Sequence, residues 1–455
     1  MAAPQPSPTN WLEGRLIEPG DQDYDDARAV WNGVFDRFPA AIARVAGTAD
    51  VVRAIEFAHK AGLPVSVRGG SYNVAGTSVV DGGLVIDLSG MTRIRVDAAA
   101  RRARVQPGVR SGELLRALEA HGLVTPVGRV SQVGVAGLTL GGGIGSLMGT
   151  HGLTIDNVVS FEVVTADGRL LRAAADENED LYWALRGGGG NFGVVTEFEF
   201  HLHEQGTMLA GRVVYPAADA ADVLGFFRRF SLTVPDELTV SAGLLHTPDG
   251  QPVVVMVPVY SGDDLAEGER LLRPLRGFGR PVADTVGPMR YSEFSSMMDR
   301  SGPPGRRYHW RSGFLPDLDD DVIEVLAAGF GQVPSPHTMI LIDYLHGAAT
   351  RVAPTATAFP HRDPSFHVIV SSGWEDPAAD GRNIGWTDDV WTPLSTRSTG
   401  VYVNSLGSDG DRSIHDAYGP NHDRLAEIKS TYDPANFFHM NQNIEPQPHG
   451  RSKGA

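Results

Sequence analysis

Hydrophobic positions recur every three to four residues in parts of the chain, which is the period of an amphipathic helix. The stretch from Thr48 to Gly62 predicts such a helix, with Thr48 as its N-cap and Gly62 as its stop. A second helix is predicted from Ser111, as N-cap, to Gly122. The apolar faces consist of Val51, Val52, Ile55 and Ala58 in the first helix and Leu114, Leu115 and Leu118 in the second.

Short apolar runs bounded by turn residues predict strands in the first 200 residues. These runs are 64–67, 84–88, 102–106, 158–165, 169–172 and 193–202. Asp167-Gly168 between two of them is typical of a hairpin turn. Beyond about residue 205, helical stretches at 219–230, 264–275 and 320–329 alternate with apolar runs such as 253–259 and 339–345. We therefore expect an α+β fold whose second half is a mixed sheet with helices on one face.

Length and composition indicate a globular protein with more than one core. A chain of 455 residues is too long for a single hydrophobic core, so two lobes are expected. The net charge of −16 argues against nucleic acid or an acidic membrane as a partner, because both are polyanions. No run approaches the roughly 18 apolar residues of a membrane span. The first residues lack the features of a secretory signal, so a cytoplasmic location is expected.

The content of cysteine and histidine limits the chemistry. The chain has no Cys, which excludes disulfides, thiolate metal sites, a thiol nucleophile and a cysteinyl link to a cofactor. Its 15 His residues show neither HxH nor HExxH spacing, so no metal site is expected.

A glycine-rich segment directly follows the predicted strand 64–67. It reads Arg68-Gly69-Gly70-Ser71-Tyr72-Asn73-Val-Ala-Gly76. Consecutive glycines permit positive φ angles and allow backbone N–H groups to converge on an anion. Arg68 could add charge and Ser71 a hydroxyl donor. An ordinary glycine-rich turn is the alternative interpretation.

Two further glycine-rich segments follow. In the second, Gly134, Gly137, Leu138, Gly141, Gly142 and Gly145 alternate small and apolar residues. This pattern suits backbone packed against a large planar ligand or a pyrophosphate, although it is not the Rossmann fingerprint. The third comprises Gly187 to Gly190 and then Gly193. Such a density of glycine favours close approach of a ligand to the backbone.

These segments, in this order, resemble the berberine-bridge-enzyme-like branch of the FAD-linked oxidases. The C-terminal Tyr432-Asp-Pro-Ala-Asn436-Phe-Phe-His-Met-Asn441-Gln-Asn443-Ile444 is similar to the same family. Supporting matches lie at 31–33, 81–88, 357–362, Tyr402-Val-Asn404 and 417–419, so the resemblance covers roughly residues 25–446. It implies the PCMH-type FAD-binding fold shared with vanillyl-alcohol oxidase, plus a substrate domain with a mixed or antiparallel sheet covered by helices.

The resemblance also implies domains and cofactor contacts. Residues 1–205, completed by 411–455, would form the FAD-binding domain, and 206–410 the substrate-binding domain. The loop from Arg68 to Asn73, with Gly76, would hold the pyrophosphate, and Gly134 to Gly145 would line the ribityl and phosphate region. Gly193 and Val195 would lie on the adenosine side, and Asn441 and Asn443 near the flavin ring or ribityl chain.

The sequence departs from the family at both usual sites of covalent attachment. Tyr72 stands where most members have a His that is linked to the flavin, and Val130 stands where bicovalent members have a Cys. We therefore predict that FAD is bound without a covalent bond, which should make it a weaker oxidant. A tyrosyl-ether link through Tyr72 remains the alternative.

Catalytic residues are predicted from the family's chemistry, in which FAD accepts a hydride and the protein removes a proton. Tyr402 is the first choice as proton acceptor, because the Tyr-x-Asn pattern with Asn404 matches a family position near the flavin. Alternation in the strand 340–346 places Tyr344 and His346 on one face, where they could form an acid–base pair facing the cleft. A packing role for each of these residues is the competing interpretation.

Three more residues are candidates for the substrate side. His309 and Arg311 alternate on a probable strand and resemble a family pair that faces the substrate, and Arg311 could bind a carboxylate. Gln132 lies just before the second glycine-rich segment and could touch the substrate.

The resulting functional hypothesis is an FAD-dependent oxidase or dehydrogenase. Its substrate would be a small organic molecule, plausibly a natural-product intermediate, with O2 as electron acceptor. The alternatives are a flavin-containing cyclase or isomerase without net redox chemistry, a carbohydrate oxidase, and a binding protein that has lost its flavin. Whether the protein is a monomer or a homodimer stays open.

Overall fold

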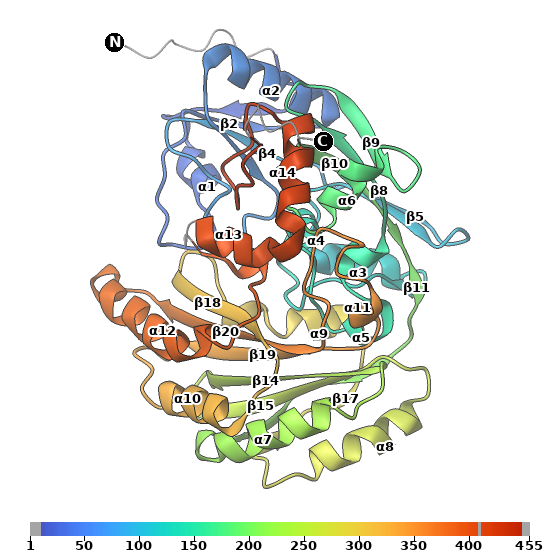
Figure 1. The fold of residues 1–455 in the computed structure, drawn as a ribbon, viewed down its shortest axis with the longest axis vertical. Helices are drawn as coiled ribbons and strands as arrows, with labels where there is room; N and C mark the ends of the chain where they lie inside the picture. Colours follow the sequence, from blue (N-terminus) through green and yellow to red (C-terminus); the bar gives the residue numbers. More distant parts are fainter. Residues whose placement is uncertain (1–10, 408–410, 448–455) are drawn as a thin grey trace, which may run out of the picture.

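The chain folds into two lobes that are stacked along its long axis (Figure 1). A computed structural model describes residues 11–407 and 411–447. The N-terminal half and the C-terminal segment share the upper lobe in Figure 1, and residues 208–395 form the lower lobe. Two β-sheets carry the upper lobe and one large sheet carries the lower.

The first sheet has the strand order β1-β2-β4-β3. β2 and β3 run parallel to the central β4, whereas β1 is antiparallel to β2. The helix α2 follows β2 and buries Val51, Ile55 and Ala58 as predicted, together with Ala54, whereas Val52 is only partly buried. The elements are β1 Arg15–Ile17, α1 Tyr24–Arg28, β2 Ala41–Arg44, α2 Thr48–Ala61, β3 Val65–Arg68 and β4 Leu84–Asp87.

The second sheet is antiparallel, in the order β5-β6-β10-β8-β9. The hairpin between β8 and β9 closes where it was predicted, with Gly168 at a φ of 80°. The strands are β5 Ile94–Asp97, β6 Arg102–Val105, β8 Val158–Val164, β9 Leu170–Ala174 and β10 Val194–His201, and a separate pair joins β7 Leu123–Val124 to β11 His203–Glu204. The helices in this part of the chain are α3 Ser111–Glu119, α4 Val135–Leu140, α5 Met148–His151 and α6 Glu179–Leu185, and the 3-10 helix η1 spans Thr154–Asn157.

The third sheet has nine strands, and every pairing in it is antiparallel, so of the two predicted alternatives, mixed or antiparallel, the antiparallel one holds. Its main order is β16-β13-β15-β14-β19-β20-β18, and β12 and β17 pair at one end. The strands are β12 Met208–Ala210, β13 Val213–Pro216, β14 Leu238–His246, β15 Pro252–Tyr260, β16 Ala283–Asp284, β17 Gly287–Met289, β18 Arg307–Leu315, β19 Met339–Leu345 and β20 Ser365–Trp374.

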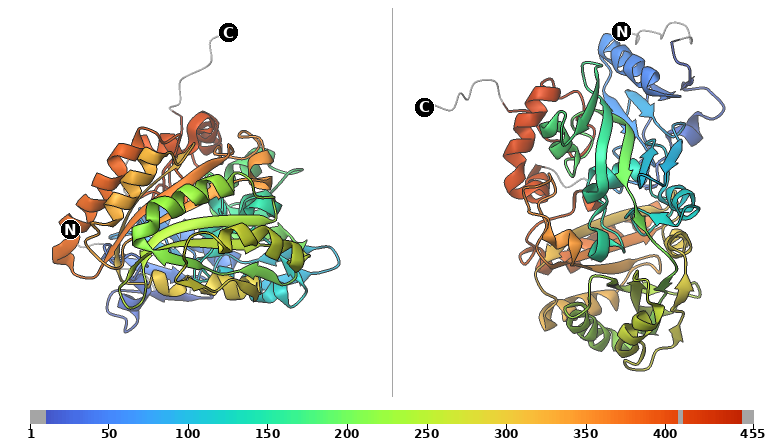
Figure 2. Two further views of the ribbon diagram at one scale, coloured as in Figure 1. Left: turned by 90° about the horizontal axis from the view of Figure 1, so that it is seen from below. Right: turned by 90° about the vertical axis from the view of Figure 1, so that its right-hand side faces the viewer.

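Helices cover one face of the third sheet, and the other face meets the upper lobe (Figure 2). α7, α8, α10 and α12 share one apolar core with this sheet, as predicted for a sheet with helices on one face. The lower-lobe helices are α7 Ala220–Ser231, α8 Leu265–Arg276, α9 Tyr291–Ser296, α10 Asp320–Phe330, α11 Ala348–Arg351 and α12 Asp380–Ser395. The chain then returns to the upper lobe with η5 Val403–Ser405, α13 Asp411–Tyr418 and α14 His422–Tyr432. Short 3-10 turns also lie at 217–219, 299–301, 377–379 and 419–421.

Two predicted helix caps differ from the structure by one residue. Gly47 occupies the N-cap of α2 and Arg110 that of α3, so Thr48 and Ser111 are already helical. The Ser111 hydroxyl donates instead to the carbonyl of Val133, 3.1 Å away, because the second glycine-rich segment lies against the start of α3. A tertiary contact has thus replaced the local cap.

A buried ion pair joins the two lobes. The Arg362 guanidinium donates to both carboxylate oxygens of Asp156 at 2.8 Å. It also donates to the carbonyl of Ala349 and the hydroxyl of Thr357. Bidentate pairs of this kind fix orientation as well as adding energy. The segment after α11 is therefore held firmly against η1 of the upper lobe.

Stacked histidines near the boundary between the lobes predict a loss of stability in acid. The rings of His151 and His203 stack 3.9 Å apart, and burial lowers the pKa of His151 to about 4 and of His203 to about 3. Below about pH 6.5 the unfolded chain binds these protons and the folded chain does not, so the free energy of unfolding falls from there to about pH 4. In urea unfolding, His203→Gln should reduce that slope by up to about 1.4 kcal/mol per pH unit. An unchanged slope would contradict this assignment.

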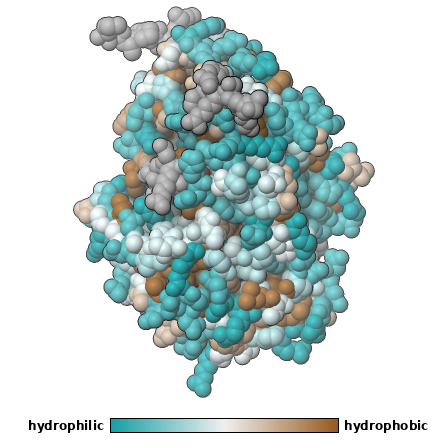
Figure 3. All heavy atoms as spheres, in the orientation of Figure 1, coloured by the Kyte–Doolittle hydropathy of each residue, from teal (hydrophilic) through white to brown (hydrophobic). Residues whose placement is uncertain are grey.

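On the face drawn in Figure 3, hydrophobic residues appear in small groups. Hydrophilic residues predominate in Figure 3, and the large exposed hydrophobic side chains, Phe38, Leu170, Leu232 and Val282, come from separate parts of the chain. Within residues 11–407 and 411–447, no helix is both long and apolar enough to cross a membrane. In the same residues, no group of three or more His, Asp or Glu side chains is placed to hold a metal ion.

Candidate active site

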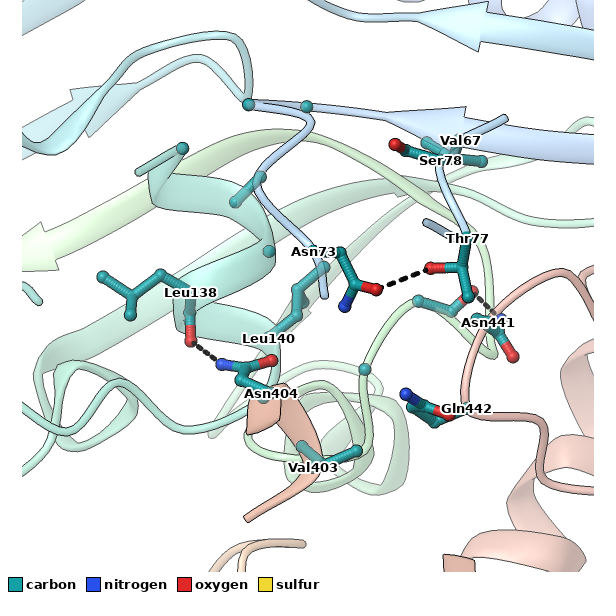
Figure 4. Close-up of a pocket in the computed structure, with 18 of the residues that line it drawn as sticks. Val67, Asn73, Thr77, Ser78, Leu138, Leu140, Val403, Asn404, Asn441 and Gln442 are labelled. Carbon is teal, nitrogen blue, oxygen red and sulfur yellow. Dashed lines mark hydrogen bonds between the residues drawn. The ribbon is translucent and has the colours of Figure 1, made fainter. Parts of the chain in front are cut away.

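A cavity of about 370 Å³ lies between the two upper sheets, the C-terminal segment and the edge of the third sheet. Figure 4 shows part of its wall, with Asn73, Thr77, Leu138, Asn404 and Asn441 around the space. Of the residues predicted to bind cofactor, substrate or a proton, those that line it are Gly69, Gly70, Ser71, Tyr72, Asn73, Gly134, Gly137, Leu138, Gly141, Gly193, Val195, Tyr402, Asn404 and Asn441. All three glycine-rich segments therefore meet in one place.

The first two glycine-rich segments touch through their backbones. A Cβ added to Gly70 would lie 2.5 Å from the Cα of Gly134, so neither position has room for a side chain. At Gly137 the situation is different, because an added Cβ would meet no protein atom within 4 Å. Gly137 therefore borders open cavity, and its missing side chain leaves space for a ligand.

The loop 69–73 presents unpaired backbone donors to the cavity. The N–H groups of these five residues donate to no acceptor in the part of the chain that the structure describes. Ser71 has a φ of 58°, a left-handed conformation that re-aims the chain here. Converging N–H groups in a turn form a concavity for an anion. The loop thus has the geometry expected of a phosphate-binding segment.

The C-terminal segment forms another wall and is fixed by a buried ion pair. Lys429 Nζ lies 2.6 Å from the Asp433 carboxylate and also donates to the carbonyls of Asn191 and Phe438. Asp433 in turn accepts the N–H groups of Phe437 and Phe438. This network ties the residues leading to Met440, Asn441 and Gln442 to the third glycine-rich segment.

Tyr402 lies where the upper lobe meets the third sheet. Its hydroxyl oxygen accepts the N–H of Gly143 at 2.8 Å and the side-chain amide of Asn404 at 2.8 Å. Asn404 is itself held by a bond to the carbonyl of Leu138 (Figure 4). Burial raises the pKa of Tyr402, and the hydrogen bonds from Gly143, Asn404 and Ile144 act in the opposite direction. The phenol is thus fixed by donors that would stabilise its anion.

Tyr72 lies in a stack of aromatic rings at the edge of the cavity. Its ring is 4.6 Å from Trp31, which stacks at 4.0 Å on Tyr308. The Tyr72 hydroxyl and the Trp31 indole N–H both donate to the carbonyl of Gly302, so both donors are already hydrogen-bonded within the protein. Burial raises the pKa of Tyr72 to about 12, so this phenol is protonated at neutral pH. Trp310, from β18, completes the cluster and lines the cavity.

Five predicted cofactor contacts do not line the cavity. The Arg68 guanidinium turns away and donates to the carbonyls of Ala27, Arg28 and Ala29 at the end of α1. The others are Gly76, Gly142, Gly145 and Asn443. The three glycines lie against protein, since an added Cβ would come within 2.4 Å of Phe35 at Gly76, 3.1 Å of Phe359 at Gly142 and 2.0 Å of the Val127 carbonyl at Gly145.

The structure places His309 and Arg311 on the far face of β18. Both side chains contact the Asp388 carboxylate of α12, His309 at 3.2 Å and Arg311 at 2.7 Å. The residue between them, Trp310, is the one that reaches the cavity. Gln132 is exposed and accepts a hydrogen bond from Arg110, away from the cavity.

The same shift of one residue occurs on β19. Tyr344 packs into the core under the helices, 4.8 Å from the ring of Phe366. His346 contacts the Thr239 hydroxyl at 3.1 Å, close to Gly149 of α5, and does not border the cavity. The prediction that Tyr344 and His346 form a pair facing the cleft is therefore corrected. Asp343 and Leu345 are the residues of this strand that face the upper lobe.

Several functional candidates were missed in the sequence. Asp343 forms an ion pair with Arg129 across the lobe boundary, and His367 lies beside it on β20. The alternation of β19 could have indicated Asp343 if the opposite face had been chosen. Tyr418, Gln442 and Trp310 also line the cavity. Tyr418 and Gln442 lie in segments that carry the family resemblance, whereas no local sequence signal singles out Trp310.

The comparisons with known proteins agree with this geometry. An "FAD binding domain" model matches residues 39–174, and a "Berberine and berberine like" model matches residues 401–445. An FAD-linked oxidoreductase of Dictyostelium discoideum is 32% identical over 440 residues, covering 96% of this chain and 95% of the relative. The chain belongs to the berberine-bridge-enzyme-like family of FAD-linked oxidoreductases.

Proteins named as oxidases are similar to this chain over nearly its whole length. The (R)-6-hydroxynicotine oxidase of Paenarthrobacter nicotinovorans is 30% identical over 456 residues, with 96% of this chain and 97% of that protein covered. A crystal structure of 6-hydroxy-D-nicotine oxidase from Arthrobacter nicotinovorans superposes with a TM-score of 0.86 at 30% identity, over 96% and 98% of the two chains. A xylooligosaccharide oxidase from Myceliophthora thermophila gives 0.84 at 26% identity, over 95% and 97%. The protein is thus an FAD-dependent oxidoreductase with the predicted two-lobed fold.

The cavity fits FAD, the cofactor of this family. Three polar atoms on its wall are buried and have no partner within the described residues, namely the Tyr418 hydroxyl, Asn441 Oδ1 and Trp310 Nε1. Buried polar groups are normally hydrogen-bonded, so these atoms require a ligand or water. Together with the unpaired N–H groups of 69–73, they supply partners for a polar, elongated cofactor.

Gly137→Val provides a direct test of this placement. We expect the side chain to occupy the cavity and to weaken FAD binding by about 10- to 100-fold, the cost of overpacking a filled site. The stability of the apoprotein should not fall, because an added Cβ meets no protein atom. The measurement is a fluorescence titration of apoprotein with FAD. Gly385→Val is the matched control, since Gly385 is also helical, in α12, with open space around its Cβ position.

Proposed function

We propose that the protein is an oxidase that removes a hydride from a small organic molecule, uses a dissociable FAD and passes electrons to O2. In the proposed division, residues 1–205 with 411–455 form the FAD-binding domain and residues 206–410 the substrate-binding domain. The observation that carries the proposal is the cavity, which joins three glycine-rich segments to Tyr402 at the lobe boundary.

The chemistry of Tyr72 supports a non-covalent cofactor. An ether link requires a phenolate, whereas Tyr72 is protonated, donates to Gly302 and stacks on the ring of Trp31. Val130, the other position of attachment in the family, lines the cavity and offers no nucleophile. We propose that the wall formed by Tyr72 and Trp310 positions the cofactor by contact in place of a covalent bond.

The mechanism assigns the proton transfer to Tyr402. FAD, when bound, supplies the hydride acceptor. The hydroxyl oxygen of Tyr402 takes a proton from the substrate as the hydride leaves, and the N–H groups of Gly143 and Asn404 stabilise the phenolate form that acts as base. The Asn404 amide also donates to the carbonyl of Leu138 on the cavity wall, which fixes its own position beside the Tyr402 hydroxyl.

The substrate is proposed to be an activated small molecule of the natural-product type, rather than a carbohydrate. The nicotine oxidase relative acts on a compound of this size, and the wall here carries Trp310 and several aliphatic side chains from 130 to 140. An activated substrate also suits a flavin that lacks the covalent links which raise its potential.

Acid precipitation of the purified protein tests the cofactor part of the proposal. We expect FAD in the supernatant and a colourless pellet. Colour in the pellet would mean a covalent link, and no colour in either fraction after added FAD would contradict the flavoprotein assignment. Anaerobic mixing with candidate substrates then tests the chemistry: bleaching of the flavin supports oxidation, whereas product formed without bleaching would support a cyclase or isomerase.

A further inference from the structure

A buried polar cluster lies next to Tyr402 and plays no part in the mechanism above. It consists of Arg129 from the upper lobe, Asp343 on β19 and His367 on β20. Asp343 and His367 are paired across neighbouring strands and are 6% and 2% exposed. The His367 ring meets that of Tyr402 edge-on, 5.5 Å between centroids. None of the three lines the cavity itself, but Arg129, whose side chain is 19% exposed, directly precedes Val130, which does.

The guanidinium of Arg129 has an unused hydrogen-bonding edge. Its Nη1 forms the ion pair with Asp343, but its Nε and Nη2 are buried and have no partner in residues 11–407 or 411–447. These two atoms carry parallel N–H groups, which is the edge that binds a carboxylate through two hydrogen bonds. Leaving such donors buried and unpaired is costly, so a ligand that satisfies them would be bound preferentially.

His367 adds a further unsatisfied group beside the same edge. Both ring nitrogens are buried without a hydrogen-bond partner in the described chain, and Nδ1 lies 4.0 Å from the Asp343 carboxylate, too far for a hydrogen bond. Burial lowers the pKa of His367 to about 4, so the neutral ring offers one donor. The other ring nitrogen is an acceptor, and Asp343 Oδ1 also has no hydrogen-bond partner among the described residues, but the unpaired N–H groups of Arg129 and His367 still outnumber these two acceptors.

We propose that Arg129 and His367 form a subsite that binds a carboxylate of the substrate, with Asp343 holding the guanidinium in place. The inference rests on the proposed function and specifies its substrate as an organic acid. A carboxylate matches the two N–H groups of the Arg129 edge with two oxygens, whereas an amide offers one oxygen and an NH2 group that would oppose the second donor. The acid group would then lie on the side of the cluster where the His367 ring meets that of Tyr402.

Benzoate and benzamide provide a matched pair of probes, since they differ only in this group. In titrations of the FAD-loaded protein, followed by the flavin difference spectrum, we expect benzoate to bind at least about tenfold more tightly than benzamide. Arg129→Lys keeps the charge but loses the two-donor edge, and it should reduce the preference. Arg172→Gln, which removes an exposed arginine of β9, is the control and should leave it intact.

Asp343→Asn gives a second test, in which the affinity for benzoate should rise rather than fall. Removing the carboxylate that shares the guanidinium should strengthen benzoate binding, because Arg129 no longer serves two anions. Equal affinities for benzoate and benzamide, an unchanged preference in Arg129→Lys, or tighter binding of benzylamine than of benzoate would overturn the proposal. If the protein takes up no FAD, the proposed function fails separately, and the same ligands can be titrated into the apoprotein by calorimetry.

Discussion

Tyr402→Phe should lower kcat/KM by about 100- to 10,000-fold, the usual effect of removing a general base. The substitution deletes only the oxygen that accepts from Gly143 and Asn404, so the ring still fills its place beside Phe359. The measurement is the anaerobic rate of flavin bleaching with a substrate that reduces the wild-type protein. FAD should remain bound, because the glycine-rich walls are unchanged.

The pH profile separates a chemical from a structural role of Tyr402. Burial raises the pKa of this phenol, and the basic form is the phenolate, so the wild-type rate should increase with pH into the alkaline range. The Phe variant should lose that increase as well as the rate. Asn404→Ala is the companion variant: it removes one donor to the phenolate and should shift the profile further to alkaline pH. A Phe variant with wild-type bleaching rates would contradict the assignment.

Lys429→Met should destabilise the protein by about 3–5 kcal/mol and release FAD, the expected cost of breaking a fully buried ion pair. Lys429 and Asp433 are both 0% exposed in their side chains. Without the ammonium group, the Asp433 carboxylate is buried uncompensated and the carbonyls of Asn191 and Phe438 lose their donor. Urea unfolding and FAD titration are the measurements.

Two further variants identify the cause of that loss. Lys429→Met combined with Asp433→Asn removes both charges and keeps one of the two oxygens that accept the N–H groups of Phe437 and Phe438, so part of the stability should return. Lys60→Met removes the exposed pair with Glu56 on α2 and should cost less than about 1 kcal/mol. Equal losses in Lys60→Met and Lys429→Met would show that burial of the pair is not the reason.

The position of the cofactor site was predictable because glycine leaves a local signal. Gly70, Gly134 and Gly137 stand where backbone touches backbone or borders open space, and a side chain at such a position is excluded whatever the rest of the fold. Arg68 shows the limit of this reasoning. Its place in a glycine-rich motif suggested a phosphate contact, yet its guanidinium caps the end of α1, which only the packing of that helix could decide.

The sequence by itself determined the family, the α+β elements and the three segments around the cofactor. These depend on local spacing and on glycines at positions where a side chain would not fit or would fill the cavity. The tertiary structure decided which face of β18 and of β19 meets the cavity. Strand side chains alternate with a period of two, so both faces of these buried strands are acceptable until the helix layer covers one of them. The helices pack on the face that carries Arg311 and Tyr344, so Trp310 and Asp343 lie on the face toward the upper lobe.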